Sequence, residues 1–317
     1  MKDQPLCSIV IPTLNEEKNI QQCLLHLNNQ SYPRELYQIV VVDNGSSDST
    51  LLLANELADI VLELPKGNVG AVRNFGISNS NGEIVICTDA DCVVGKDWIK
   101  NGVNLLSSHP KSVFGGGLKP GDDASWIERG WLLNDSGKNI QQNDLMGSCI
   151  FLWKNDFVSM GGFNENITSG EDSELSSKLK LNNFSVILSP KLSLVHLGNP
   201  KSIVGFIKRQ IWHSENYSRN FTASFKDKIF LLTLFFMGSL ILSIGILFFN
   251  PDLWETTILT QVSPIILSIK RLRRSSVFPD RLAIIFQVLL IDNLYLVGRS
   301  IGLLKGIFIN RSGYHSS

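Results

Sequence analysis

Short apolar runs alternate with helical patterns over residues 1–225. Four of the runs are apolar along most of their length rather than alternating with polar residues: CSIVIPT, YQIVVVD, DIVLELP and GEIVICTD. Between the first two, Ile20, Leu24 and Leu27 recur at helical spacing. Strands of this kind, separated by helices, predict an α/β fold in which helices cover both faces of a mostly parallel sheet.

The composition changes after residue 225, and residues 226–317 form a second region. Residues 229–249 are 21 consecutive positions without a charge. At ~1.5 Å per residue, a helix of that length crosses the roughly 30 Å hydrocarbon core of a bilayer. We therefore expect a membrane-spanning helix over 229–249, the alternative being a buried helix of a soluble core.

The charges around the next apolar segment, residues 254–269, bear on whether it also spans. Lys226 and Lys228 precede the first span, NPDLWE follows it without a basic residue, and KRLRR occupies positions 270–274. Basic residues gather on the cytoplasmic side of membrane proteins. This pattern predicts that residues 254–269 cross back as a second span.

The last apolar segment, residues 282–309, is interrupted by Asp292 and Arg299. These two share one helical stripe with three further residues: Tyr295, Gly302 and Gly306. A charge at the centre of a bilayer costs at least ~2.5–3.5 kcal/mol. The segment is therefore either an amphipathic helix at the membrane interface or a third span whose stripe pairs with protein, and we favour the interface.

The charge balance argues against a nucleic-acid partner, and the cysteine pattern indicates the cellular compartment. Lys plus Arg and Asp plus Glu both number 29, so no global basicity points to nucleic acid. The five cysteines show no metal-binding spacing, which suits a reducing compartment. The apolar run near the N-terminus is too short for a signal peptide. We expect a cytoplasmic body attached to a membrane, such as the bacterial inner membrane.

Carboxylates follow the apolar runs where the strands are expected to end. Asp89 and Asp91 stand one residue apart, and in an extended chain both point the same way. Mg²⁺ and Mn²⁺ take such oxygen ligands, although an Asx turn is the simpler explanation of the pair. Asp43 ends another run, as a turn former or a ligand contact, and Thr13 and Glu16 close the first. Parallel sheets bind ligands beyond these strand ends.

Four other residues have both a structural and a chemical interpretation. Arg73 is either a solvated helix arginine or a phosphate contact. Glu171 and Asp172 either cap a helix start or supply a general base. His196 follows an apolar strand, either as a core histidine or as a further metal or phosphate contact.

Six segments in this order resemble the inverting family 2 glycosyltransferases: SIVIPTLNEEKNI, IVVVDNGSSDST, GNVGAVRNFGI, GEIVICTDADCVV, GGFNENITSGEDSEL and LVHLGNP. The resemblance covers residues 6–215. It implies the GT-A fold, the Rossmann-like fold of nucleotide-diphospho-sugar transferases. Residues 1–225 are then the catalytic domain, and residues 226–317 the membrane region.

The resemblance also implies roles for the site residues. Thr13, Glu16 and Asp43 would line the nucleoside site. Asp89 would lie near the ribose or the diphosphate, and Asp91 would hold the divalent cation, Mg²⁺ or Mn²⁺.

On the acceptor side, the resemblance makes Asp172 the general base, with Glu171 supporting it. One departure concerns the Gln-x-x-Arg-Trp motif of processive members, because residues 207–216 read IKRQIWHSEN instead. The departure argues against a processive polymerase. We expect Arg209 to contact the diphosphate, the alternative being a surface arginine.

The implied reaction transfers a hexosyl or N-acetylhexosaminyl group with inversion from a nucleoside-diphosphate sugar to an acceptor hydroxyl. We favour a UDP-sugar donor over a GDP-sugar. A lipid-linked glycan or a cell-surface polysaccharide precursor suits an anchored enzyme, and a soluble acceptor is the alternative.

Two other functions, a nucleotidyltransferase and a non-catalytic scaffold, fit the sequence less well. A sugar-nucleotide nucleotidyltransferase usually has a glycine-rich basic loop after its first strand, whereas IPTLNEEKNI is acidic and lacks glycine. A non-catalytic membrane scaffold would retain the fold but not the acids, all of which are present here.

Overall fold

The computed structural model describes residues 4–133, 140–141, 144–167, 170–215, 224–225, 227–275 and 282–312. The chain folds into two compact units. Unit 1 comprises Met1–Gly121 and Gly137–Gly198, and unit 2 comprises Asp122–Ser136 and Asn199–Ser317.

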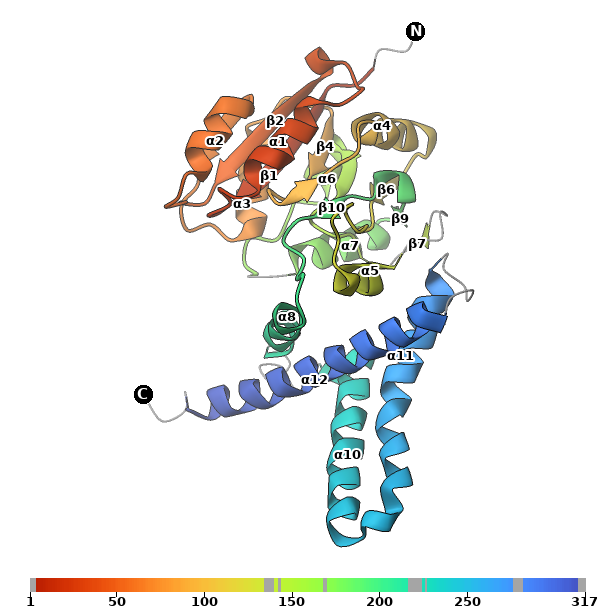
Figure 1. Ribbon diagram of the computed structural model, residues 1–317. Coiled ribbons are helices and arrows are strands. Elements are labelled where there is room, and N and C mark those ends of the chain that lie inside the picture. Colours follow the sequence, from red (N-terminus) through yellow and green to blue (C-terminus); the bar gives the residue numbers. More distant parts are fainter. Residues whose placement is uncertain are drawn as a thin grey trace. The chain divides into compact units, whose positions relative to one another are not determined.

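Within the described residues, unit 1 is built on one eight-stranded sheet (Figure 1). The strand order is β3-β2-β1-β4-β8-β6-β9-β7, with β1 (Cys7–Thr13), β2 (Tyr37–Asp43), β3 (Ile60–Glu63), β4 (Ile84–Cys87), β6 (Ser112–Gly115), β7 (Ile140–Gln141), β8 (Ile150–Trp153) and β9 (Ser185–Leu188). Strands β1 to β4 run parallel, β8 is antiparallel to β4 and β6, and β6 is parallel to β9. The predicted mostly parallel sheet is confirmed.

Helices pack on both faces of this sheet, as the apolar runs predict. They are α1 (Ile20–Asn28), α2 (Thr50–Leu57), α3 (Val69–Ser78), α4 (Trp98–Ser108), α6 (Lys154–Ser159) and α7 (Glu171–Leu181), with short 3₁₀ turns η1 (Arg34–Leu36) and η2 (Pro190–Leu192). Ile9 and Ile39 belong to the core beneath α1 and α4. Val10 and Val40 belong to the core beneath α3 and α7. Successive strand residues face opposite sides, so a sheet covered twice needs continuously apolar strands.

Unit 2 is helical. Its elements are α5 (Trp126–Leu132), α8 (Ile203–Glu215), α10 (Lys228–Phe249), the 3₁₀ segment η4 (Pro251–Gln261), α11 (Val262–Arg274) and α12 (Leu282–Ser312). Helix α10 and the η4–α11 arm form a hairpin, because Ser263 Oγ donates to the Leu232 carbonyl and Ser243 Oγ to the Thr256 carbonyl. Helix α12 runs across this hairpin rather than alongside it (Figure 1).

Among the described helices, Lys228–Phe249 and Leu282–Ile307 are long and apolar enough to cross a membrane. The first contains the span predicted over 229–249. The second span predicted over 254–269 falls on η4 and α11, which are 11 and 13 residues long. That span therefore stays a prediction, although the hairpin brings its basic end back toward the start of α10.

The polar stripe of α12 is buried against protein. The carboxylate of Asp292, 1% exposed, accepts hydrogen bonds from Arg271 Nη1 and, at 2.7 Å, from Ser268 Oγ. Tyr295 stacks on Trp131 with ring centroids 5.2 Å apart. Gly302 lies so close to α8 that a Cβ would stand 2.1 Å from Ser214 Oγ. The stripe thus pairs with protein whether or not α12 spans.

The division into units differs from the boundary predicted at residue 225. Helix α5 packs on α12, where Gly130 adjoins Ile291, and Gln287 Nε2 donates to the Trp126 carbonyl. Helix α8 packs along α12 through Gly298 and Gly302. Both helices therefore fold with the C-terminal region, which sequence periodicity alone does not reveal.

Candidate active site

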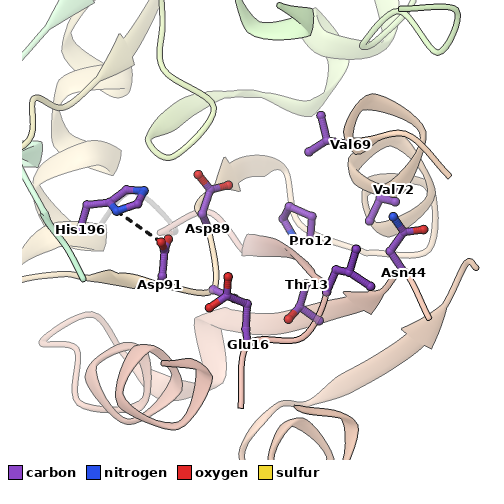
Figure 2. A pocket seen from close by; sticks show the side chains of 11 residues that line it. Pro12, Thr13, Glu16, Asn44, Val69, Val72, Asp89, Asp91 and His196 are labelled. Atoms are coloured by element: carbon purple, nitrogen blue, oxygen red, sulfur yellow. Dashed lines mark ion pairs between the residues drawn. The ribbon is translucent and has the colours of Figure 1, made fainter. Parts of the chain in front are cut away.

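A cavity of about 380 Å³ lies at the carboxyl ends of β1, β2 and β4 in unit 1 (Figure 2). Its lining residues are Pro12, Thr13, Leu14, Glu16, Asn44, Val69, Val72, Asp89, Ala90, Asp91 and His196. This edge of a parallel sheet is where ligands are expected to bind. Thr13, Glu16, Asp89, Asp91 and His196 were all singled out from the sequence.

A short strand pair brings His196 to the two aspartates. Strand β5 (Cys92–Val93) follows Asp91, and β10 (Val195–His196) pairs with it in antiparallel register, His196 opposite Cys92. His196 Nδ1 lies 3.3 Å from Asp91 Oδ2 (Figure 2). The contact joins residues 105 positions apart in the chain, so only the fold creates it.

The donor atoms at this point could hold a divalent cation. Ligand atoms of Asp89, Asp91, Cys92 and His196 all lie within 4.8 Å of one another. Burial raises the pKa of the Cys92 thiol, followed by the charges of Asp89 and Asp91, so this sulfur stays protonated. Hard cations prefer carboxylate oxygens to a thiol, and imidazole is a nitrogen ligand of divalent transition metals. The set that fits Mg²⁺ or Mn²⁺ is therefore Asp89, Asp91 and His196.

Gly198 makes room for Asp91. A Cβ at position 198 would stand 2.4 Å from Asp91 Oδ2, well inside contact distance. The Leu197 N–H also donates to the Asp91 carbonyl oxygen at 2.7 Å. Residues after β10 thus hold the aspartate in place, and the sequence contains no signal for this beyond the glycine itself.

Glu16 adds a third carboxylate at the rim of the cavity. Its backbone N–H donates to Thr50 Oγ1 at 2.7 Å, and Asn19 Nδ2 donates to its Oε2 at 2.8 Å. Burial raises the pKa of the Glu16 carboxyl against that hydrogen bond, and the charges of Asp91 and Asp89 raise it further. Three mutually repelling carboxylates favour a cationic ligand.

Thr13 and Asp43, both predicted to line the nucleoside site, differ in what they offer. Thr13 ends β1, is 4% exposed and, within the described structure, has an Oγ1 without a hydrogen-bond partner. A buried orphan hydroxyl beside a cavity suits a polar ligand. The Asp43 carboxylate instead accepts the N–H groups of Gly45 and Ser46 and the Ser46 hydroxyl.

Asp43 thus acts as the turn former that the sequence allowed as an alternative, and a nucleoside contact for it stays a prediction. Its neighbour Asn44 reaches the cavity instead. The Asn44 side chain donates to the Gly67 carbonyl and accepts the Gly67 N–H, both at 2.9 Å. Asn44 was missed because an Asn-Gly pair signals a turn before it signals a binding residue.

Arg73 lies between two carboxylates rather than on the helix surface. It is 3% exposed, and its Nη1 donates to Glu171 Oε1 at 2.6 Å and its Nη2 to Asp89 Oδ1 at 2.8 Å. Burial opposes the charge of the guanidinium, but Asp89 and Glu171 outweigh it and raise the pKa of Arg73. The arginine therefore stays charged and links the strand end of β4 to the start of α7. A phosphate contact for Arg73 stays a prediction.

The Glu171-Asp172 pair begins α7 directly after the N-cap residue Gly170, where acidic side chains complement the helix dipole. Glu171 is 7% exposed and pairs with Arg73. Asp172 Oδ2 accepts the Gly147 N–H at 3.0 Å. A Cβ on Gly147 would stand 2.6 Å from the Arg73 guanidinium, so this glycine lets the arginine and Asp172 share one backbone segment. Gly147 is a second residue that sequence reasoning missed.

Arg209, predicted to contact a diphosphate, belongs to α8 of unit 2. Its Nη1 donates to Asn199 Oδ1 at 3.1 Å. That prediction stays untested.

Residues 8–155 match the family model described as Glycosyl transferase family 2. Glycosyltransferase AglE of Haloferax volcanii is 36% identical over 121 residues, which are 36% of this chain and 40% of that protein. A dolichyl N-acetyl-alpha-D-glucosaminyl phosphate 3-beta-D-2,3-diacetamido-2,3-dideoxy-beta-D-glucuronosyltransferase of Methanococcus voltae is 25% identical over 237 residues, 64% of this chain and 70% of that protein. The chain thus matches about two fifths of the length of AglE.

Among solved structures, the mannosyltransferase PcManGT of Pyrobaculum calidifontis, in complex with GDP-Man and Mn²⁺, superposes with a TM-score of 0.59. The likeness covers 96% of this chain and 88% of that one at 18% identity. At this identity the likeness concerns the fold, and it confirms the GT-A fold that the family resemblance implies.

Proposed function

We propose that the chain, whose residues 8–155 match the Glycosyl transferase family 2 model, is a membrane-anchored inverting glycosyltransferase. It transfers a sugar from a nucleoside-diphosphate sugar to an acceptor hydroxyl. One observation carries the proposal: Asp89 faces the cavity and is joined through Arg73 to Glu171, the neighbour of Asp172. Donor and acceptor chemistry would then meet at a single strand end.

On the donor side, the cavity would take the nucleoside diphosphate, with a UDP-sugar favoured and a GDP-sugar as the alternative. Thr13 and Glu16 line it, and Thr13 has a hydroxyl to offer. Asp89, Asp91 and His196 would hold Mg²⁺ or Mn²⁺, and PcManGT binds Mn²⁺ together with its GDP-sugar. When bound, such a cation stabilises the departing diphosphate and orients it.

On the acceptor side, Asp172 would be the general base. It would take the proton of the acceptor hydroxyl while the hydroxyl oxygen bonds to the anomeric carbon and the bond to the diphosphate breaks. One base opposite the leaving group gives inversion. Gly147 holds one oxygen of Asp172, and Glu171, fixed by Arg73, precedes it on the helix.

The helices of unit 2 would anchor the enzyme, with the catalytic domain in the cytoplasm. Apolar side chains are exposed along α10, among them Phe235, Ile241 and Phe248. Because α12 runs across the hairpin, it would lie at the interface if α10 spans (Figure 1). The Methanococcus voltae relative acts on a dolichyl phosphate derivative by its name, which supports a lipid-linked acceptor.

A donor screen tests this function. The purified full chain, with Mn²⁺, is given a panel of sugar nucleotides, and release of nucleoside diphosphate is measured. We expect release from one or a few donors, abolished by EDTA and by Asp172→Asn. Binding of a donor without release under any condition would favour a non-catalytic scaffold, and release of pyrophosphate would indicate a nucleotidyltransferase.

A further inference from the structure

A second cavity, of about 430 Å³, lies on α11 of unit 2, far along the chain from the candidate active site. Its lining residues are Ile266, Ile269, Lys270 and Arg273. Counted from Ile266, the others follow at three, four and seven positions, which is the spacing of one helix face. Two aliphatic side chains are thus followed, toward the helix end, by two cationic ones.

The two faces of α11 have different tasks. The inward face carries Leu267, Ser268 and Arg271, and Arg271 pairs with Asp292 of α12. Ile266 and Ile269 on the outward face are 47% and 46% exposed. Within the described part of the chain, neither Lys270 nor Arg273 forms an ion pair. The packing of unit 2 therefore uses the inward basic residue and leaves the outward pair available.

The hairpin register sets the level of these cations relative to α10. Ser263 is level with Leu232, because its hydroxyl donates to that carbonyl. From there Lys270 is seven residues, or about 10 Å, further along α11, whereas Lys228 is four residues, or about 6 Å, back along α10. Lys270 and Arg273 thus lie just beyond the apolar part of the hairpin, at headgroup level if α10 spans.

We propose that this cavity binds an anionic phospholipid of the bilayer. Lys270 and Arg273 hold its phosphate, and an acyl chain lies along Ile266 and Ile269. The charge complementarity is specific, since a zwitterionic headgroup would gain little from two cations. The proposal rests on the membrane anchoring proposed above but not on catalysis.

The test measures lipid binding by the full chain in neutral detergent. Phosphatidylglycerol, phosphatidylcholine and inorganic phosphate are titrated separately, and bound lipid is counted by native mass spectrometry. Each basic residue next to an anionic headgroup contributes roughly fivefold in affinity, so Lys270→Gln/Arg273→Gln should weaken phosphatidylglycerol binding about 30-fold. The charge-matched control Lys100→Gln/Lys191→Gln, on exposed positions of unit 1, should leave it unchanged.

Lys270→Arg/Arg273→Lys keeps both charges and should retain binding, which separates a binding effect from a folding defect. Equal affinity for phosphatidylglycerol and phosphatidylcholine would overturn the proposal. So would binding of a polyisoprenyl phosphate in preference to phosphatidylglycerol, or competition by inorganic phosphate as strong as by the lipid. Sugar transfer without selective lipid binding leaves the proposed function standing, and the reverse result leaves the lipid site standing.

Discussion

Unit 1 and unit 2 each pair an arginine with buried carboxylate, and the two arrangements differ in their balance of charge. In unit 2, Arg271 faces one carboxylate, Asp292, and its other terminal nitrogen donates to the carbonyls of Gly130 and Trp131. In unit 1, Arg73 faces two carboxylates, those of Glu171 and Asp89. One cluster is neutral, and the other is acidic.

The acidic excess grows toward the cavity of unit 1. Asp91 and Glu16 add two further carboxylates there, and His196 is the one basic residue among the described lining residues of the cavity. Buried charge without compensation is costly. The neutral cluster of unit 2 therefore joins helices. The acidic cluster at the cavity of unit 1 instead favours binding of a cation together with a ligand.

The largest effect is expected from Asp172→Asn, which removes the proposed base. The rate of transfer should fall by roughly 10²–10⁴-fold, because general base catalysis contributes about that much. Donor affinity, measured by equilibrium binding, should be nearly unchanged. The control Glu174→Gln, in the same first turn of α7, should keep most of the activity. Near-normal transfer by Asp172→Asn would remove this residue from the mechanism.

Substitutions in the neutral cluster of unit 2 should change the stability of the fold in the way expected for an ion pair. Arg271→Met leaves Asp292 buried without its cation and should destabilise the fold by about 3–5 kcal/mol. Arg271→Met/Asp292→Leu removes both charges and should recover most of that loss. Thermal unfolding in detergent measures both. A double variant no more stable than the single one would show that the carbonyl contacts of Arg271 matter more than its pairing.

The corresponding ion pair in unit 1, Arg73 with Glu171, should affect catalysis as well as stability. Arg73→Met/Glu171→Leu should recover part of the stability that Arg73→Met loses, for the same reason. Transfer should nevertheless stay low, since Asp172 would lose the neighbour that Arg73 fixes. Full transfer by this double variant would mean that Arg73 and Glu171 only hold the fold together.

Much of this acidic cluster could be predicted from sequence, because Glu16, Asp89 and Asp91 follow apolar runs. Glu171 stands instead where a helical pattern begins. The prediction that the Asp89 and Asp91 side chains point the same way required only the alternation of side chains along an extended chain. The pairing of Arg73 with Glu171 could not be predicted, since 98 positions separate them and an arginine on a helix usually faces water. Gly147 and Gly198 were missed because their role is to lack a side chain.

The sheet was predictable for a physical reason that does not extend to unit 2. Strands covered on both faces must be apolar throughout, and that leaves a clear pattern. Helix α8 instead packs on α12 at Gly298 and Gly302, and α5 packs on α12 at Gly130. The spacing of residues within one helix does not specify such contacts. Asp43 shows a third limit, since a turn former and a ligand residue look alike in sequence.

Removal of the cation tests whether the excess of carboxylates at the cavity serves to bind a metal ion. EDTA or Asp91→Asn should weaken donor binding by at least the roughly 10–100-fold that is typical of residues merely supporting a metal ligand. His196→Gln should act in the same direction. Cys92→Ala should leave metal dependence unchanged, because burial keeps its thiol protonated. An isotherm unaffected by EDTA would exclude the cation, and a large effect of Cys92→Ala would place sulfur among the ligands.

The smallest effect is expected at Glu16. Its pKa is raised by burial, and further by Asp91 and Asp89, so the folded protein binds this proton more tightly than the unfolded chain does. A raised pKa favours the fold below the unfolded pKa, and the benefit is lost as the pH rises through the folded pKa. Glu16→Gln should therefore slightly raise the Tm of the metal-free protein at neutral pH. Below the ordinary pKa of glutamate the two Tm values should converge.

A bound cation should reverse this order of Tm values between wild type and Glu16→Gln. With Mn²⁺ present, wild type should gain more stability than Glu16→Gln, because the third carboxylate attracts the cation, and the variant should lose roughly tenfold in Mn²⁺ affinity at most. The control Glu63→Gln, exposed at the end of β3, should change neither quantity. A loss as large as that of Asp91→Asn would make Glu16 a direct ligand. Identical Tm values at every pH would mean that neither burial nor the neighbouring carboxylates disfavour the charge of Glu16, and the contrast with unit 2 would then disappear.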